Sequence, residues 1–132
     1  MRKGGSKQNE FKQNAEAEAK DVTISPADED FLNKALRFVE KNMDNSEYSV
    51  DELSDDMAMS RATLFRKMRS VIGMSPTDFI RNTRLKRAAQ LITEGRLSVT
   101  EIAYSVGYSS PGHFTKSFKK EFGVLPTQYH KT

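Results

Sequence analysis

Basic residues at helical spacing dominate one segment of the chain, residues 60–73, which contains no acidic residue. Its bases are Arg61, Arg66, Lys67 and Arg69. Counted at about 100° per residue from the apolar Leu64, the positions of Ala62, Arg66 and Arg69 lie on the opposite face of a helix. Guanidinium groups bind phosphates, and one guanidinium can donate two hydrogen bonds to a guanine in the major groove of DNA. The segment therefore predicts a helix whose exposed face binds a polyanion.

A second segment, residues 109–122, repeats this arrangement with lysines. Counted from the apolar Phe114, the positions of Gly112, Lys116 and Lys119 lie opposite the apolar face. A duplicated helical hairpin that only packs is the alternative interpretation. A solvated helix face usually mixes acids and bases, so the acid-free segment 60–73 favours anion binding over packing.

The charge of the whole chain is divided between its two halves. Residues 1–56 carry 14 acids and 8 bases, a net charge of −6, whereas residues 57–132 carry 4 acids and 13 bases, a net charge of +9. The overall charge of +3 conceals this asymmetry. A strongly basic half indicates a polyanionic partner, with nucleic acid favoured over an anionic membrane surface. The alternative is a basic surface that is only solvated.

Several classes of function are excluded or disfavoured by what the sequence lacks. It contains no cysteine, which excludes disulfides, thiolate metal sites and cysteine nucleophiles and fits a cytoplasmic location. The two histidines lie 17 residues apart, so no metal site is expected, and no cofactor is expected either. The helical part of the sequence has neither a glycine-rich phosphate loop nor a pair of acids placed for catalysis, so no enzyme activity is expected. No apolar run reaches the roughly 18 residues of a membrane span, and no signal peptide is visible.

The pattern of caps, apolar positions and stops predicts an all-α fold of seven helices. Serines precede several apolar-periodic segments and can cap them, prolines fit the first turns, and glycines end them. The expected helices cover residues 26–43, about 50–57, 61–72, 76–94, 99–106, 111–122 and 126–130. The helix at 76–94 is the longest, at roughly 27–30 Å for a rise of 1.5 Å per residue.

The second half of the chain repeats the first. A shift of 49 residues aligns SVDEL at 49–53 with SVTEI at 98–102 and Ser60 with Ser109. After one inserted residue, a shift of 50 aligns Leu64 with Phe114 and the bases and stops that follow. Ala58 and Gly107 fall in equivalent turns. Each copy reads as a short helix, a tight turn and a second helix with a basic face, which is the helix-turn-helix pattern.

This repeat divides the chain into four parts. Residues 1–25 are polar and are expected to be a linker or tail, either disordered or a solvated helix. Residues 26–75 form the first helix-turn-helix unit, residues 76–94 the connecting helix, and residues 95–132 the second unit. We refer to these below as the first unit and the second unit.

The ordered motifs of both units resemble the AraC/XylS family of transcription regulators. The resemblance rests on SRATLFRKM at 60–68, GMSP at 73–76 and RLKRA at 84–88, and in the second unit on IA at 102–103, VGY at 106–108, FTKSFKK at 114–120, Gly123 and PTQY at 126–129. It covers about residues 28–130 and implies a seven-helix fold whose two units occupy adjacent major grooves of double-stranded DNA. Residues 42–90 most resemble the output domain of hybrid two-component regulators.

In the first unit, Arg66 is the favoured base-contacting residue, and Arg61, Ala62 and Phe65 match reading positions of the family. Phe65 lies between core and groove, and core packing is the favoured interpretation for it. The small side chain of Ala62 is expected either to contact a thymine methyl group or only to leave room for the DNA. Arg69 and Ser60 are the phosphate-contacting candidates.

In the second unit, His113 and Lys116 are the favoured readers, with Thr115 as a lesser candidate. Gly112 stands at a reading position without a side-chain donor, which departs from the family. This departure indicates that the unit reads fewer bases, or that it reads DNA by shape and backbone. His113 is equally well explained as a solvated first-turn residue. Ser109, Lys119 and Lys120 are expected to contact phosphates. In the connecting helix, Lys86 is interpreted as solvated, whereas Arg81 and Arg84 stay open between phosphate contact and a solvated face.

The resulting interpretation is a sequence-specific DNA-binding domain of AraC type, the output module of a larger two-component protein. The alternatives are a stand-alone regulator and a protein-interaction module without DNA contacts; RNA binding is disfavoured because the aromatic residues fall on inner positions. RNA polymerase is an expected partner if the protein activates transcription. A homodimer would form through domains outside this chain.

Overall fold

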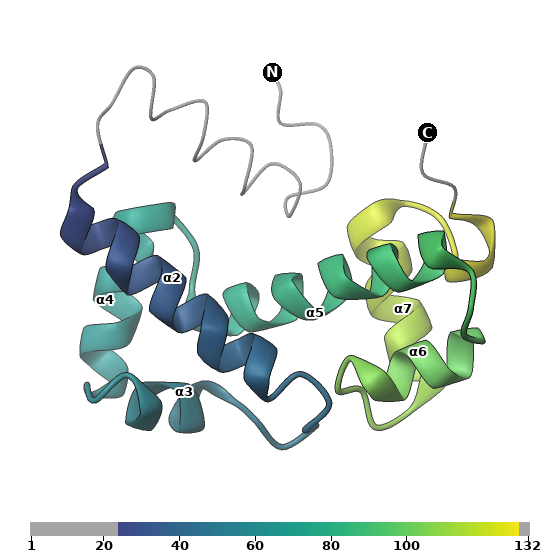
Figure 1. Ribbon diagram of the computed structural model, residues 1–132, viewed down its shortest axis with the longest axis horizontal. Helices are drawn as coiled ribbons and strands as arrows, with labels where there is room; N and C mark the ends of the chain where they lie inside the picture. The colour runs from purple at the N-terminus through teal and green to yellow at the C-terminus, as the bar shows by residue number, and fades with distance from the viewer. Residues whose placement is uncertain (1–23, 130–132) are drawn as a thin grey trace.

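The computed structural model describes residues 24–129, and these fold entirely into helices and connecting turns (Figure 1). The elements in chain order are α2 (Pro26–Lys41), α3 (Val50–Asp56), α4 (Arg61–Ile72), α5 (Pro76–Glu94), α6 (Val99–Ser105), α7 (Pro111–Phe122) and the 3₁₀ turn η1 (Pro126–Gln128). The all-α prediction is confirmed. The expected helix at 126–130 takes the form of the single turn η1, and the predicted tail lies outside the described residues except for Ile24 and Ser25.

Local sequence signals explain where these helices begin and end. Ser25, Ser60, Ser75 and Ser98 each accept a hydrogen bond from the backbone N–H three residues on, which satisfies one of the free donors of a helix start. Ser49 begins α3 in a capping box with Glu52, as expected. The cap of α7 is Ser110 and not Ser109, because the residue inserted in the second copy stands before the helix.

Two apolar cores lie at opposite ends of the molecule. In the first unit, α2, α3 and α4 pack around buried side chains that include Phe31, Leu53, Leu64 and Met68. In the second unit, α6 and α7 pack around a core that includes Ile102, Val106, Phe114 and Phe118. Most of the predicted inner positions are therefore buried in both copies, whereas Ile72 and Phe122, at the ends of α4 and α7, are half-buried.

The long helix α5 belongs to both cores. Phe79 and Ile80 near its start are buried in the first unit, whereas Leu85 and Ala88 further along are buried in the second. Its 19 residues span about 28 Å at 1.5 Å per residue. Figure 1 shows α5 running between the two ends of the molecule, so that it is a packed connection and not a free linker.

The tight turn of each unit contains one residue in the left-handed backbone region. In the first unit this residue is Ala58, with φ of +59°, and in the second it is Gly107, with φ of +89°. Among the described residues, Ala58 is the non-glycine residue with positive φ, a conformation that a Cβ atom disfavours. The predicted equivalence of the two turns is thus visible in the backbone.

None of the helices described for this chain combines the length and the apolar character that crossing a lipid bilayer requires.

Candidate nucleic-acid interface

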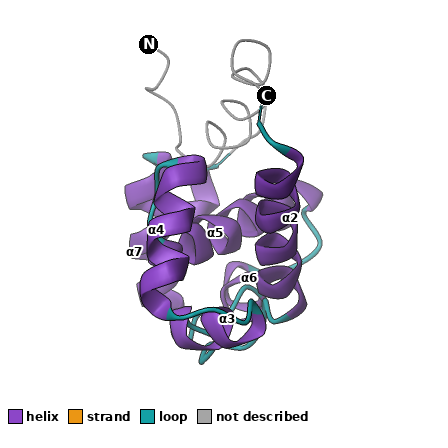
Figure 2. Ribbon diagram, turned by 90° about the vertical axis from the view of Figure 1, so that its left-hand side faces the viewer, coloured by secondary structure: helices purple, strands orange, loops and turns teal. Residues whose placement is uncertain are grey.

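The two basic helices lie on one side of the molecule. Figure 1 places α4 and α7 toward opposite ends of α5, and Figure 2, which looks at the molecule end-on, draws both on the same side of α5 with α2 on the other. Each packs its apolar face inward, through Leu64 and Met68 in α4 and through Phe114 and Phe118 in α7. Their basic faces are therefore presented from a common side and are separated along α5.

On α4, the side chains predicted to face a ligand are exposed. These exposed residues are Arg61, Ala62, Arg66 and Arg69. Arg66 directs its Nη2 atom toward Thr63 Oγ1 at 3.4 Å, a long contact that leaves most of its donors for other acceptors. Ser60 uses its hydroxyl as the acceptor of the helix cap, at 3.1 Å from Thr63 N, and its hydroxyl also approaches Thr63 Oγ1.

Arg61 is held by contacts that the sequence did not predict. Its Nη1 atom lies 2.7 Å from Asp51 Oδ1 of α3, and its guanidinium lies 5.5 Å from the centre of the Phe65 ring. Both partners of the ion pair are more than half exposed, so water screens the pair. Phe65 is half-buried and packs against the first core, as the favoured interpretation expected. A base contact by Arg61 would compete with Asp51.

On α7, the exposed face carries lysines. Gly112, His113, Lys116, Lys119 and Lys120 are exposed, and Thr115 is half-buried. The His113 ring packs edge-on against Tyr108 with 5.4 Å between ring centroids, so it is partly held in place. Ser109 is exposed and stands beside the capping residue.

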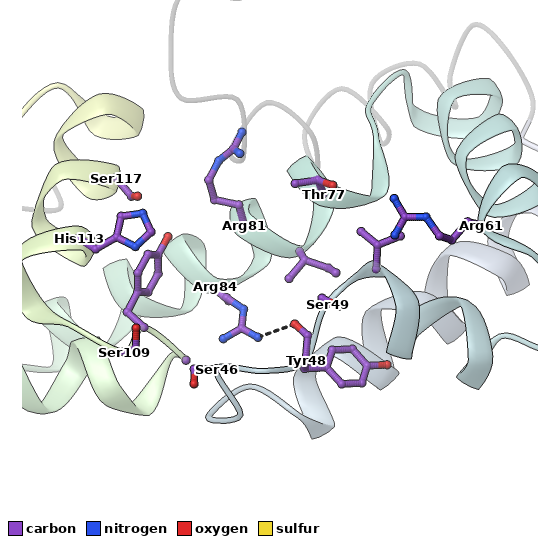
Figure 3. A pocket seen from close by; sticks show the side chains of 14 residues that line it. Ser46, Tyr48, Ser49, Arg61, Thr77, Arg81, Arg84, Ser109, His113 and Ser117 are labelled. Carbon is purple, nitrogen blue, oxygen red and sulfur yellow. Dashed lines mark hydrogen bonds between the residues drawn. The ribbon is translucent and has the colours of Figure 1, made fainter.

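A groove of 580 Å³ lies over α5 between α4 and α7 (Figure 3). Arg61 stands at one end and His113 and Ser117 at the other, with Arg81 of α5 between them. Arg81 is exposed and pairs with Asp78 through Nη2 and Oδ1 at 2.7 Å. Burial raises the pKa of Tyr108, which also lines the groove, and a hydrogen bond with Ser117 partly offsets this effect. The lining of the groove thus mixes polar and apolar groups, and arginines border it.

The basic residues near the middle of α5 are Arg81, Arg84, Lys86 and Arg87. Arg84 differs from the other three because it is buried. It is 6% exposed and lies at the floor of the groove, where burial lowers its pKa. Neither interpretation left open for it, phosphate contact or a solvated face, describes this position. The spacing of apolar residues could have predicted this burial. Arg84 lies four residues after Ile80 and four before Ala88, which are both buried, so it falls on the apolar face of α5.

Comparisons with known proteins agree with this architecture. A family model described as a helix-turn-helix domain matches residues 53–132. A curated relative, "Histidine kinase P4" of Formosa agariphila, is 42% identical over 109 residues, which are 83% of this chain and 8% of that protein. This chain thus spans only a small part of that relative.

Solved structures share the fold. The C-terminal domain of AraT, a response regulator from Geobacillus stearothermophilus, is 28% identical with a TM-score of 0.70, over 82% of this chain and 86% of that one. The DNA-binding domain of AdpA, a global transcriptional factor solved in complex with a target DNA, is 26% identical with a TM-score of 0.68, over 74% of this chain and 87% of that one. Because the family model covers more than half of the sequence, this chain belongs to the AraC-type family of helix-turn-helix domains.

Proposed function

We propose that this chain binds double-stranded DNA sequence-specifically, with α4 and α7 in two adjacent major grooves, as the output domain of a two-component regulator of transcription. The observation that supports this most is the placement of two acid-poor, basic helix faces on one side of α5. Successive major grooves on one side of B-DNA lie about 34 Å apart, and the length of α5, roughly 28 Å, is near that separation.

The proposed base contacts come mainly from the first unit. Arg66 is exposed at the centre of α4 and can donate two hydrogen bonds to one guanine. Arg61, Ala62 and Phe65 flank it, with Arg61 exchanging Asp51 for a DNA acceptor on binding. In the second unit, Lys116 and His113 are the proposed readers, and Gly112 and Thr115 add close backbone or hydroxyl contact.

The remaining exposed bases are proposed to position the DNA without reading it. Arg69 on α4 and Lys119 and Lys120 on α7 lie in the last turns of their helices, with Ser60 and Ser109 at the opposite ends. Contacts to phosphates fix the register of a protein on the duplex and carry no sequence information directly. AdpA, which shares this fold, was solved with a target DNA, and this supports the proposal.

The role of output domain rests on two of the relatives. One is described as a histidine kinase and the other as the C-terminal domain of a response regulator. In this proposal the domain works in the cytoplasm, other domains of the protein receive the signal and form any homodimer, and an activator would also contact RNA polymerase. A reading frame that continues upstream of residue 1 into a receiver or kinase domain supports the role, whereas a separate gene favours the stand-alone regulator.

A competition gel-shift separates DNA reading from a protein-interaction role. The chain is mixed with labelled genomic fragments from its source and challenged with excess unlabelled random DNA. We expect at least one fragment to stay bound when random competitor is in roughly 10³-fold excess, the lower end of the usual ratio between specific and non-specific affinity. If every labelled complex is lost when the random competitor is only as concentrated as the labelled fragment, sequence-specific binding is contradicted.

A further inference from the structure

Arg84 of α5 is a buried cation that donates hydrogen bonds to four backbone carbonyls. Its Nη1 atom lies 3.0 Å from Met43 O and 2.9 Å from Val106 O. Its Nη2 atom lies 3.0 Å from Asn45 O and 3.2 Å from Tyr48 O. A guanidinium suits this arrangement because its five donors are fixed in one plane, and four carbonyl dipoles compensate the loss of water.

The four carbonyls belong to different parts of the molecule. Met43, Asn45 and Tyr48 lie in the loop that joins α2 to α3 in the first unit, whereas Val106 ends α6 in the second unit. Figure 3 shows the Arg84 side chain on the floor of the groove, reaching the backbone at Tyr48. One side chain of the connecting helix therefore ties both units to each other.

The turn at Gly107 supplies the space for this contact. A Cβ atom built at Gly107 would overlap Nη1 of Arg84 and crowd the carbonyl oxygen of Met43. The equivalent turn of the first unit accommodates Ala58 at a positive φ of +59°, so a positive φ in this turn does not by itself exclude a side chain. The close approach of Arg84 explains why the second turn has no side chain.

We infer that Arg84 is a positioning residue that fixes the orientation of α7 relative to α4. It thereby sets which spacing the chain accepts between two blocks of preferred bases in the DNA, one read by α4 and the other by α7. This inference rests on the proposed function. α5 packs into both cores and fixes the separation of the units. The Arg84 contacts with both units add a restraint on how each unit tilts about α5, and a more rigid pair of units tolerates fewer spacings of the DNA.

The test compares Arg84→Met with Arg87→Met, a matched change at an exposed arginine of the same helix. Each full chain is titrated with the best selected DNA site and with the same site carrying one or two base pairs inserted between its blocks. We expect the insertions to weaken wild-type binding roughly tenfold or more, a loss similar to that of a mismatched base pair. We expect the insertions to weaken binding by Arg87→Met as much as binding by wild type. For Arg84→Met, we expect a weaker affinity for the original site and a further loss of less than threefold on insertion.

An Arg84→Met protein that keeps the wild-type spacing penalty overturns the inference. If that variant loses its helical circular dichroism, Arg84→Lys replaces it, because a lysine keeps the charge but cannot reach all four carbonyls. Residual dipolar couplings of the free chain give a readout that needs no DNA: we expect one alignment tensor for both units in wild type and two in the variant. One shared tensor in the variant would also overturn the inference, whereas a wild type without DNA specificity refutes the proposed function alone.

Discussion

The arginines of this chain divide by the acceptors within their reach. Arg66 is exposed and makes one long contact with Thr63, Arg61 is paired with Asp51, and Arg84 is surrounded by backbone carbonyls. A guanidinium that the protein already satisfies gains little from a phosphate or a base, because it must first give up its partners. On this ground Arg66 is more available to a DNA base than Arg61 or Arg84.

Replacing Arg66 with alanine is expected to weaken binding to a selected DNA site by roughly 1–3 kcal/mol and to relax the preference at one base pair. The loss arises because a guanine would keep two acceptors without their donor. The measurement is a titration by fluorescence anisotropy against the selected site and its single-base variants. Arg37→Ala, at an exposed arginine on α2 on the far side of α5, is the control and is expected to change little. Equal losses on selected and random DNA would place Arg66 on a phosphate instead.

Lys119 belongs to the residues proposed to hold phosphates. Lys119→Ala is expected to lower the slope of log affinity against log salt by about one unit, because one fewer counterion is released on binding. Sequence preference is expected to stay unchanged. Titrations at several salt concentrations, with the exposed Lys34→Ala on α2 as control, measure both quantities. A slope identical to that of wild type would exclude Lys119 from the contact.

At the scale of the helices, most boundaries were predictable because they depend on local chemistry. A serine before an apolar-periodic run and a glycine after it predicted the limits of α4 and α5, and both glycines adopt the left-handed cap. The position of the inserted residue was less clear, since two adjacent serines can each cap a helix. Pro111 settles it, because a proline fits the first helical position and leaves Ser110 as the cap.

The turn between α3 and α4 contains a strained residue that can be relieved. Ala58→Gly is expected to raise the free energy of unfolding by roughly 0.5–1 kcal/mol, because glycine adopts positive φ without the steric cost that a Cβ atom meets. Ala58 is exposed, so little packing is lost. Urea denaturation measures the change, and Ala27→Gly in the first turn of α2 serves as the control that lowers stability. A lower free energy of unfolding for Ala58→Gly would mean that packing of the Ala58 methyl group stabilises the fold by more than the backbone strain destabilises it.

At the scale of the whole molecule, the repeat predicted two units and a connecting helix of the observed length, Pro76–Glu94. It did not predict how the units are oriented. That orientation depends on contacts such as those of Arg84 with carbonyls 41 and 22 positions away, and no periodic pattern reports a contact between a side chain and a distant backbone. The same limit applies to Arg61 and Asp51, which are ten residues apart on different helices.

Selection of bound duplexes from a random pool, with wild type, Arg66→Ala and Lys116→Ala, tests most directly whether two helices read two grooves. The account predicts two blocks of preferred bases with centres about 10–10.5 base pairs apart, one helical turn of DNA. Arg66→Ala should erase preference within one block only and Lys116→Ala within the other only. A single block, or two substitutions that affect the same bases, would contradict the account.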